Sequence, residues 1–147
     1  MEIKFRGKRV DNGEWVYGLL VYQNHIRVFS PCKSLPDEDG KIYEWADIQE
    51  YEVIKDTVGQ STGHYDKNKI EIFNGDIVSF YVRNDYFNKI LKTGYVFWND
   101  KLGGWYIQDF IKYQSKANLY VSKNVKIIGN IFDNKELLEE EIWIKKY

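Results

Sequence analysis

The chain has 147 residues, which suffice for one domain with a proper core or for two small lobes. A hydrophobic content of 44% is that of a globular protein, and a formal net charge of −1 excludes a global field that attracts nucleic acid or an anionic membrane. One cysteine and two histidines exclude a disulfide framework within the chain and a structural zinc site built from four Cys or His ligands.

The N-terminal third is predicted to form successive β-hairpins, because it is rich in β-branched and aromatic residues punctuated by Asn, Asp and Gly. In IKFRGKRV apolar and basic side chains alternate, and the Asn-Gly pair at 12–13 predicts a hairpin into a strand over 14–22. A turn at 23–24 leads into a third strand. Residues 31–40 hold both prolines and three consecutive acids, so we expect an exposed loop there, followed by a short strand or helical turn over 42–48.

The centre of the chain is dense in turn-forming residues. After a short strand over 51–54 we predict turns over 59–69, then the strand IEIF, a tight turn at 74–76 and the longer strand IVSFYV. The segments KTGYVFWND and GWYIQDF, joined by a Gly-Gly turn, predict a second clear hairpin. We expect a loop over 112–118 and a last strand that starts at Val125.

The tail changes character after the last strand. Asp133 and Glu136 have the spacing of a capping box, acids crowd the start of the segment and lysines crowd its end. We therefore predict a short C-terminal helix over about 134–145. The predicted fold class is all-β, mainly antiparallel and hairpin-rich, with this one short helix.

The elements suggest a division of the chain into lobes. We predict an N-terminal β lobe over 1–56, a lobe over 57–133 that is SH3-like or forms a small, partly open barrel, and a helical tail over 134–147. One compact domain with a single shared core is the alternative.

Several strands are apolar on both faces. In EWVYGLLVY, Trp15, Tyr17 and Leu19 lie on one face while Val16 and Leu20 lie on the other. A sheet with one wet face alternates apolar and polar residues, so these strands need a cover on both faces. We expect the second cover to come from another lobe or another subunit, which predicts a homo-oligomer.

No combination of residues indicates catalysis, a metal or a cofactor. His64 and Asp66 could form an acid-base pair, but they lie in a predicted turn with no nucleophile nearby in sequence, so an exposed turn histidine is the favoured interpretation. The central glycines lack the spacing of a phosphate-binding loop. We therefore predict a protein that is not an enzyme. Gln60, Thr62 and His64 are kept as a candidate polar site, because the predicted turn does not need their side chains.

Basic residues near aromatic ones form a second candidate site. Lys4, Arg6, Lys8 and Arg9 lie close to Trp15, and a basic stripe beside aromatic rings on a β surface is how single-strand binders stack bases and follow phosphates. The same alternation is also shown by any half-exposed strand. Single-stranded nucleic-acid binding is therefore the alternative function, and protein–protein contact is the favoured one.

The N-terminal sequence MEIKFRGKRV has no apolar segment typical of a secretory signal, and no apolar run approaches the ~20 residues of a membrane helix. These features, with the single thiol, predict a cytoplasmic protein that does not contact membranes.

Three blocks resemble, in order, the family of YopX-like proteins from bacteriophages and prophages. The blocks are IKFRGKRVDNGEWVYG, TVGQSTGHYDKNKIEIFNGDIV and VKIIGNIFDNKELL. The usual family pattern has a KFR start, a TVGQ-TG-DKNG-EI-GDIV centre and a GNI-(D/E)N-ELL close. Lys69 stands where the family commonly has Gly, which predicts a turn that does not require positive φ there, and Lys135 stands where it commonly has Pro.

The resemblance implies a mainly β protein encoded by a phage or prophage of a bacterial host. It also implies self-association, in agreement with the two-sided apolar strands, and it implies no reaction, cofactor or catalytic residue. The function predicted from both sources is that of a non-enzymatic accessory protein. Its partners would be further copies of itself and a host or phage protein.

Overall fold

A computed structural model describes residues 3–83, 86–109 and 116–138 of the chain. The chain divides into two compact units, Glu2–Gln60 and Ser61–Tyr147. Every strand pair in the described residues is antiparallel, so the prediction of a mainly antiparallel β protein is confirmed. The predicted lobes over 1–56 and 57–133 stay a prediction, since compactness alone does not show that a segment folds independently.

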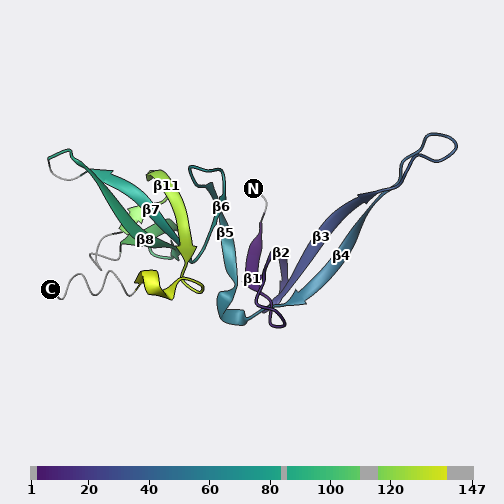
Figure 1. The fold of residues 1–147 in the computed structure, drawn as a ribbon, viewed down its shortest axis with the longest axis horizontal. Coiled ribbons are helices and arrows are strands. Elements are labelled where there is room, and N and C mark those ends of the chain that lie inside the picture. The colour runs from purple at the N-terminus through teal and green to yellow at the C-terminus, as the bar shows by residue number, and fades with distance from the viewer. Residues whose placement is uncertain (1–2, 84–85, 110–115, 139–147) are drawn as a thin grey trace. The chain divides into compact units, whose positions relative to one another are not determined.

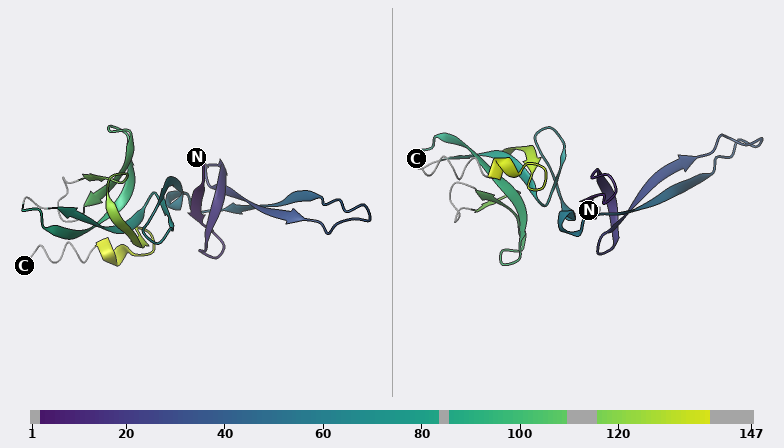
Figure 2. Two further views of the ribbon diagram at one scale, coloured as in Figure 1. Left: turned by 90° about the horizontal axis from the view of Figure 1, so that it is seen from above. Right: turned by 60° about the horizontal axis from the view of Figure 1, so that its bottom comes forward.

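The N-terminal unit is a meander in which each strand pairs with the next, in the order β4-β3-β2-β1. The strands are β1 (Phe5–Lys8), β2 (Trp15–Tyr22), β3 (His25–Lys33) and β4 (Glu44–Glu52). Beyond Arg27, β3 pairs with β4 and no longer with β2, so these two strands continue as a long two-stranded ribbon (Figure 1). Figure 2 shows the same ribbon from two further sides.

The core of this unit is small. Ile26 and Val53 are its fully buried apolar residues among those described. A side chain at Gly7 would place its Cβ 2.8 Å from Val53 Cγ2, so the glycine lets Val53 pack directly against the backbone of β1. After the short 3₁₀ turn η1 (Lys55–Thr57), the first residues of β5 (Gly59–Tyr65) pair with β1.

Two predictions for this unit are wrong. The loop expected over 31–40 starts later, because β3 continues through Pro31 to Lys33. Proline is accepted at this position because β3 has only one strand neighbour there, so a missing N–H leaves no second ladder incomplete. The separate short elements expected over 42–48 and 51–54 are one continuous strand, β4, paired along its whole length with β3.

The C-terminal unit contains a five-stranded sheet with the order β10-β9-β8-β7-β11. Its strands are β7 (Asp76–Arg83), β8 (Lys89–Asn99), β9 (Gly104–Asp109), β10 (Lys116–Asn118) and β11 (Lys123–Asn130). The edge strands β10 and β11 do not pair with each other in the described residues, so the sheet is open. The short β6 (Glu71–Phe73) pairs with β5.

One apolar cluster stabilises the C-terminal unit. Its buried members come from β6, β7, β8, β9, β11 and the segment after β10, and they are Ile72, Val78, Phe80, Val96, Ile107, Leu119 and Val125. Burial of a side chain of this size contributes about 1.5–3 kcal/mol relative to leaving it exposed. The predicted hairpin of KTGYVFWND and GWYIQDF is β8 and β9, and it supplies two of these core residues.

The expectation of turns over 59–69 is wrong for its first half, where β5 is a strand. A β-bulge lies between Ser61 and Tyr65, and Gly63 adopts a φ of +74° within it. The hydroxyl groups of Ser61 and Thr62 each accept a hydrogen bond from the backbone N–H group two residues later, which is why the segment has the composition of a turn. The loop expected over 112–118 ends earlier than predicted, because residues 116–118 form β10, and residues 112–115 lie outside the described part.

A helix begins at Lys135 and continues to the end of the described residues at Leu138. The predicted short C-terminal helix is thus confirmed, while its expected continuation to residue 145 lies outside the described part. Within the described residues, no helix has the length and apolar composition needed to cross a bilayer.

Candidate functional site

Strands β3 and β4 form a ribbon, here called the β3–β4 ribbon, that exposes several large apolar side chains. On one face Phe29 lies opposite Ile48 and Pro31 lies opposite Ala46. The exposed fractions of Phe29 and Ile48 are 46% and 57%. On the other face Cys32 lies opposite Trp45, which is 51% exposed. Within the described residues of the N-terminal unit neither face is covered by a second layer, so the ribbon has apolar side chains exposed on both sides.

Ion pairs frame the apolar band on the first face. Arg27 Nε donates to Glu50 Oε1 at 2.8 Å on one side of the band, and Lys33 Nζ lies 3.1 Å from Glu44 Oε1 on the other. The hydrogen bond from Arg27 holds the pKa of Glu50 below its ordinary value. Because each end of the band carries one positive and one negative side chain, the face can match a second copy of itself in charge.

The free edge of β4 is acidic. This strand carries four carboxylates and no basic residue, at Glu44, Asp47, Glu50 and Glu52. Like charges brought opposite each other across a strand pair are destabilising, and acidic edges are a known protection against edge-to-edge pairing. The ribbon is therefore open for contact through its faces and protected at its edge.

The structure brings most of the predicted basic stripe together. Arg6 lies opposite Tyr17 and Lys8 lies opposite Trp15, so these side chains share one face of the sheet. The Arg6 guanidinium lies 4.7 Å from the centroid of the Trp15 ring, and Lys8 Nζ lies 5.9 Å from it. Lys4 Nζ lies 5.9 Å from the centroid of Tyr17. The stripe is thus a set of cation–π contacts along one sheet face.

Two members of the predicted stripe have structural roles instead. Arg6 is only 6% exposed, so its charge is directed at Trp15 rather than at solvent. Arg9 contacts Tyr51, with 4.4 Å from guanidinium carbon to ring centroid, and its Nε donates to Asp11 Oδ1 at 2.9 Å. This hydrogen bond raises the pKa of Arg9 and lowers that of Asp11. Trp15 therefore contacts Arg6 and Lys8, while Arg9 contacts Tyr51 and Asp11 and is not part of the stripe.

The candidate polar site does not form a cluster. Gln60 pairs with Phe5 of β1 in the N-terminal unit. Thr62 is buried, and its hydroxyl donates to the Ile72 carbonyl at 2.8 Å and accepts from the His64 backbone N–H. The half-buried ring of His64 contacts the Tyr120 ring edge-on, with 5.8 Å between centroids, at the wall of a cavity of about 330 Å³.

The carboxylate of Asp66 accepts hydrogen bonds from backbone N–H groups, and it does not form the predicted pair with His64. One carboxylate oxygen accepts from the N–H groups of Asn68 at 2.8 Å and Ile70 at 3.0 Å, and the other accepts from Ile127 at 3.1 Å. Burial opposes ionisation here, but the three backbone donors outweigh it and lower the pKa of Asp66. This carboxylate closes the turn and attaches it to β11, which is a structural role.

The turn that Asp66 closes requires the left-handed region at Lys69. Its φ is +64°, so the prediction that Lys69 removes the need for positive φ is wrong. The Lys69 N–H donates to the Asp66 carbonyl at 3.0 Å, which closes the turn around this residue. A non-glycine residue in this region is strained by about 1–2 kcal/mol.

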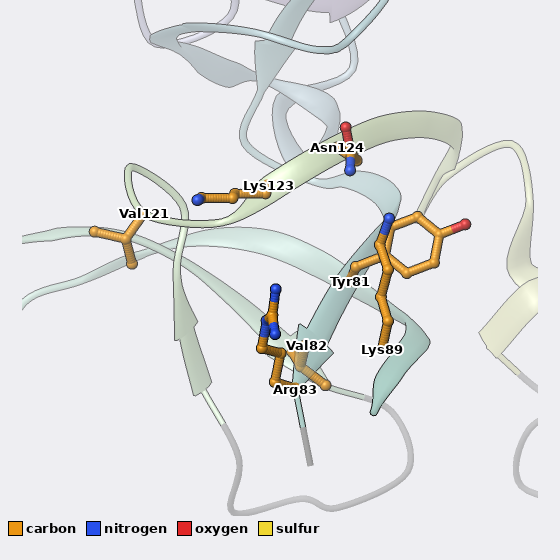
Figure 3. Close-up of a pocket in the computed structure, with 7 residues that line it drawn as sticks. All are labelled: Tyr81, Val82, Arg83, Lys89, Val121, Lys123 and Asn124. Atoms are coloured by element: carbon orange, nitrogen blue, oxygen red, sulfur yellow. The ribbon is translucent and has the colours of Figure 1, made fainter. Parts of the chain in front are cut away.

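A concave basic site lies at one end of the C-terminal sheet, and we call it the basic pocket (Figure 3). Its volume is about 390 Å³. Strands β7, β8 and β11 and the segment before β11 supply its walls, which consist of Tyr81, Val82, Arg83, Lys89, Val121, Lys123 and Asn124. Among the described residues, the lining contains three cationic side chains and no carboxylate.

Strand register explains why these cations gather. Arg83 lies directly opposite Lys89, and Tyr81 lies directly opposite Lys123. Tyr81 and Arg83 are two residues apart on β7, so all four side chains are placed on one face of the sheet. Lys89 Nζ lies 4.0 Å from the centroid of the Tyr81 ring. Sequence reasoning missed this pocket because its members come from distant segments, and only the register places them together.

In the part of the chain that the structure describes, no group of three or more His, Cys, Asp or Glu side chains is arranged to hold a metal ion. The cysteine, Cys32, lies on the β3–β4 ribbon with its thiol 3.4 Å from Asp47 Oδ2.

Comparison with known proteins gives one family and one fold. The sequence model described as YopX protein matches residues 4–139. None of the curated proteins matches the chain. Among solved structures, the chain is similar to the crystal structure of protein EF1440 from Enterococcus faecalis, with 23% sequence identity and a TM-score of 0.56. The alignment covers 94% of this chain and 99% of that one, and at this identity it supports the fold alone.

Proposed function

The chain belongs to the YopX protein family, and from this premise we propose that it is a non-enzymatic accessory protein that works through protein–protein contacts and self-associates. A phage or prophage origin and a place in the cytoplasm of the bacterial host are parts of the same proposal. They rest on the resemblance of the three sequence blocks to proteins from bacteriophages and prophages.

The observation that carries the proposal is the exposed apolar band of the β3–β4 ribbon. A two-stranded ribbon is marginally stable in water by itself, and it gains stability when a face is covered. Phe29 and Ile48 lie opposite each other in the middle of this band, both about half exposed. Exposed apolar bands rimmed by polar residues are typical of protein interaction sites.

The charges around the band favour a second copy of the chain as its cover. Two ribbons packed face to face about a two-fold axis that runs along them bring Arg27 of one copy near Glu50 of the other and Lys33 near Glu44, so that opposite charges meet at both ends. The acidic edge of β4 disfavours the other simple mode, in which two β4 strands pair edge to edge.

Native mass spectrometry and light scattering at micromolar concentration test this proposal. We expect an oligomer for the wild type, and a shift to monomer for the double variant Phe29→Ser with Ile48→Ser, because that variant removes the centre of the contact. Leu102→Ser is the matched control, since Leu102 is 60% exposed on a turn of the other unit. A monomeric wild type, or equal dissociation of the control variant, would contradict the proposal.

Single-stranded nucleic-acid binding through the stripe of Lys4, Arg6, Lys8 and Trp15 is the second candidate. The cation–π contacts of these residues support a common surface, while the burial of Arg6 counts against direct phosphate contact. Binding of an oligonucleotide that weakens with salt and is lost in Lys4→Gln with Lys8→Gln would favour this function. No binding at low salt would remove it.

A further inference from the structure

We propose that the basic pocket of the C-terminal unit binds a small molecule that carries a phosphate or diphosphate group. The site is separate from the β3–β4 ribbon, so this inference does not depend on self-association.

Charge is the first argument. Arg83, Lys89 and Lys123 are exposed cations of one pocket in a chain whose formal net charge is −1. Arg83 and Lys89 are direct cross-strand neighbours, and like charges in that position repel each other. In the described residues no carboxylate lies within ion-pair distance of either of them. An anion between the strands would turn this repulsion into attraction on both sides.

Geometry is the second argument. In Figure 3 the guanidinium of Arg83 points up from β7 into the space below Lys123, and Lys89 extends alongside the Tyr81 ring. A guanidinium presents a planar fork of donors and an ammonium is a compact point charge, and together they are the usual ligands of phosphate oxygens. The three cations come from three different strands, so the sheet fixes their spacing.

The rest of the lining indicates the size and character of the ligand. A cavity of about 390 Å³ has the volume of a small-molecule site rather than of an extended groove. Val121 provides an apolar part of the wall, and the side-chain amide of Asn124 provides both a donor and an acceptor. A phosphate group joined to a planar or apolar moiety, as in a mononucleotide, matches this combination.

Isothermal titration calorimetry at low salt tests the proposal with pyrophosphate, ADP and adenosine. We expect pyrophosphate and ADP to bind and adenosine not to bind, because the cations recognise the phosphate. Tighter binding of ADP than of pyrophosphate would identify a nucleotide-like ligand, and equal binding would identify inorganic phosphate or diphosphate as the source. Binding of adenosine as tight as that of ADP, or no binding of either phosphate compound, would overturn the proposal.

A matched pair of variants locates the binding. Arg83→Gln with Lys123→Gln removes two cations of the pocket, and we expect affinity for ADP to fall about tenfold or more for each lost contact. Lys126→Gln removes an exposed lysine of the same strand outside the pocket and should leave the affinity within about twofold. Thermal melting of both variants checks that they fold, since all three side chains are exposed.

An oligonucleotide titration separates this proposal from a nucleic-acid site. A single-stranded oligomer that binds far more tightly than ADP, and loses affinity equally in the Lys126→Gln variant, would replace the small-molecule pocket with an extended phosphate-binding face. An affinity no higher than that of ADP, lost only in the pocket variant, would support the pocket.

Discussion

The two units of the chain differ in how much apolar side chain each removes from water. In the C-terminal unit, seven buried side chains from several strands form one cluster. In the N-terminal unit Ile26 and Val53 are the fully buried apolar residues among those described, while large apolar side chains such as Phe29, Trp45 and Ile48 remain about half exposed. Antiparallel strands can therefore bury their apolar side chains in an internal core, as in the C-terminal unit, or leave them exposed for contact, as in the N-terminal unit.

Polar groups show the same contrast. In the C-terminal unit buried polar side chains have defined partners, as where Lys92 Nζ lies 2.7 Å from Oδ2 of the buried Asp109. In the N-terminal unit the ion pairs of the ribbon lie at the surface, where water and salt screen them and each contributes little to stability. The C-terminal unit is therefore expected to be sensitive to single substitutions, and the ribbon is expected to tolerate them.

The largest expected effect is the loss of a core side chain from the C-terminal unit. Phe80 is 1% exposed in the middle of the apolar cluster. We expect Phe80→Ala to lower the free energy of unfolding by about 3–5 kcal/mol, because it removes apolar contacts and leaves a cavity. Denaturation in urea measures the change. Phe29→Ala on the ribbon is the comparison variant. At concentrations where the protein is dissociated, it should lower the free energy of unfolding by less than about 1 kcal/mol. A loss equal to that of Phe80→Ala would show that the two units do not differ in this way.

Removal of the charge of Asp66 is expected to have the next largest effect. Its carboxylate accepts three backbone hydrogen bonds, and Asp66→Asn retains only one acceptor oxygen and no charge. We expect a loss of about 1–3 kcal/mol at neutral pH. Asp100→Asn, a change at an exposed turn, is the matched control and should be close to neutral.

The same substitution changes the pH dependence. The folded-state pKa of Asp66 is lowered, so its contribution is present above the ordinary carboxyl pKa and is lost as the pH falls through the lowered value. Unfolding midpoints measured from neutral pH to well below the ordinary carboxyl pKa of about 3.9 should therefore fall less steeply in Asp66→Asn than in the wild type. Parallel curves for the two proteins would contradict this account of Asp66.

The smallest expected effect is a gain. Lys69→Gly should stabilise the C-terminal unit by about 1 kcal/mol, because glycine adopts the observed φ of +64° without the strain caused by a Cβ. The greater conformational freedom of glycine in the unfolded chain reduces this gain. Lys69→Ala removes the same side chain but keeps the Cβ, so it should give no gain. Equal stability of the two variants in thermal melts would show that the backbone at this position is not strained.

Much of the fold could be predicted from local sequence. The Asn-Gly turn, the alternation in IKFRGKRV and the paired apolar runs each indicate neighbouring strands, and such pairs form the meander and the β8–β9 hairpin. The prediction failed where side chains imitate turn chemistry. The hydroxyl and glycine residues of β5 make hydrogen bonds typical of turns, yet they form a bulge within a strand.

The candidate sites could be predicted only in part, because they depend on register between distant segments. The contact of Arg6 and Lys8 with Trp15 could be predicted from the sequence, since one short hairpin joins the two strands that carry these residues. The position of Arg9 away from that face could not be predicted, because Arg9 contacts Tyr51, which lies on the distant strand β4. The basic pocket joins residues from β7, β8 and β11, and the sequence contains no local signal for such an arrangement.

The hydrogen bond from the Ile127 backbone N–H to the Asp66 carboxylate can form only late in the synthesis of the protein on the ribosome. These residues are 61 positions apart, and β11, which also supplies Val125 to the core, is the last of the described strands. While a nascent chain still lacks Lys123–Asn130, β7 has β8 as a neighbour but lacks its partner on the other side. The C-terminal unit thus cannot complete its core until β11 has left the exit tunnel, and until then the edge of β7 is open to other chains.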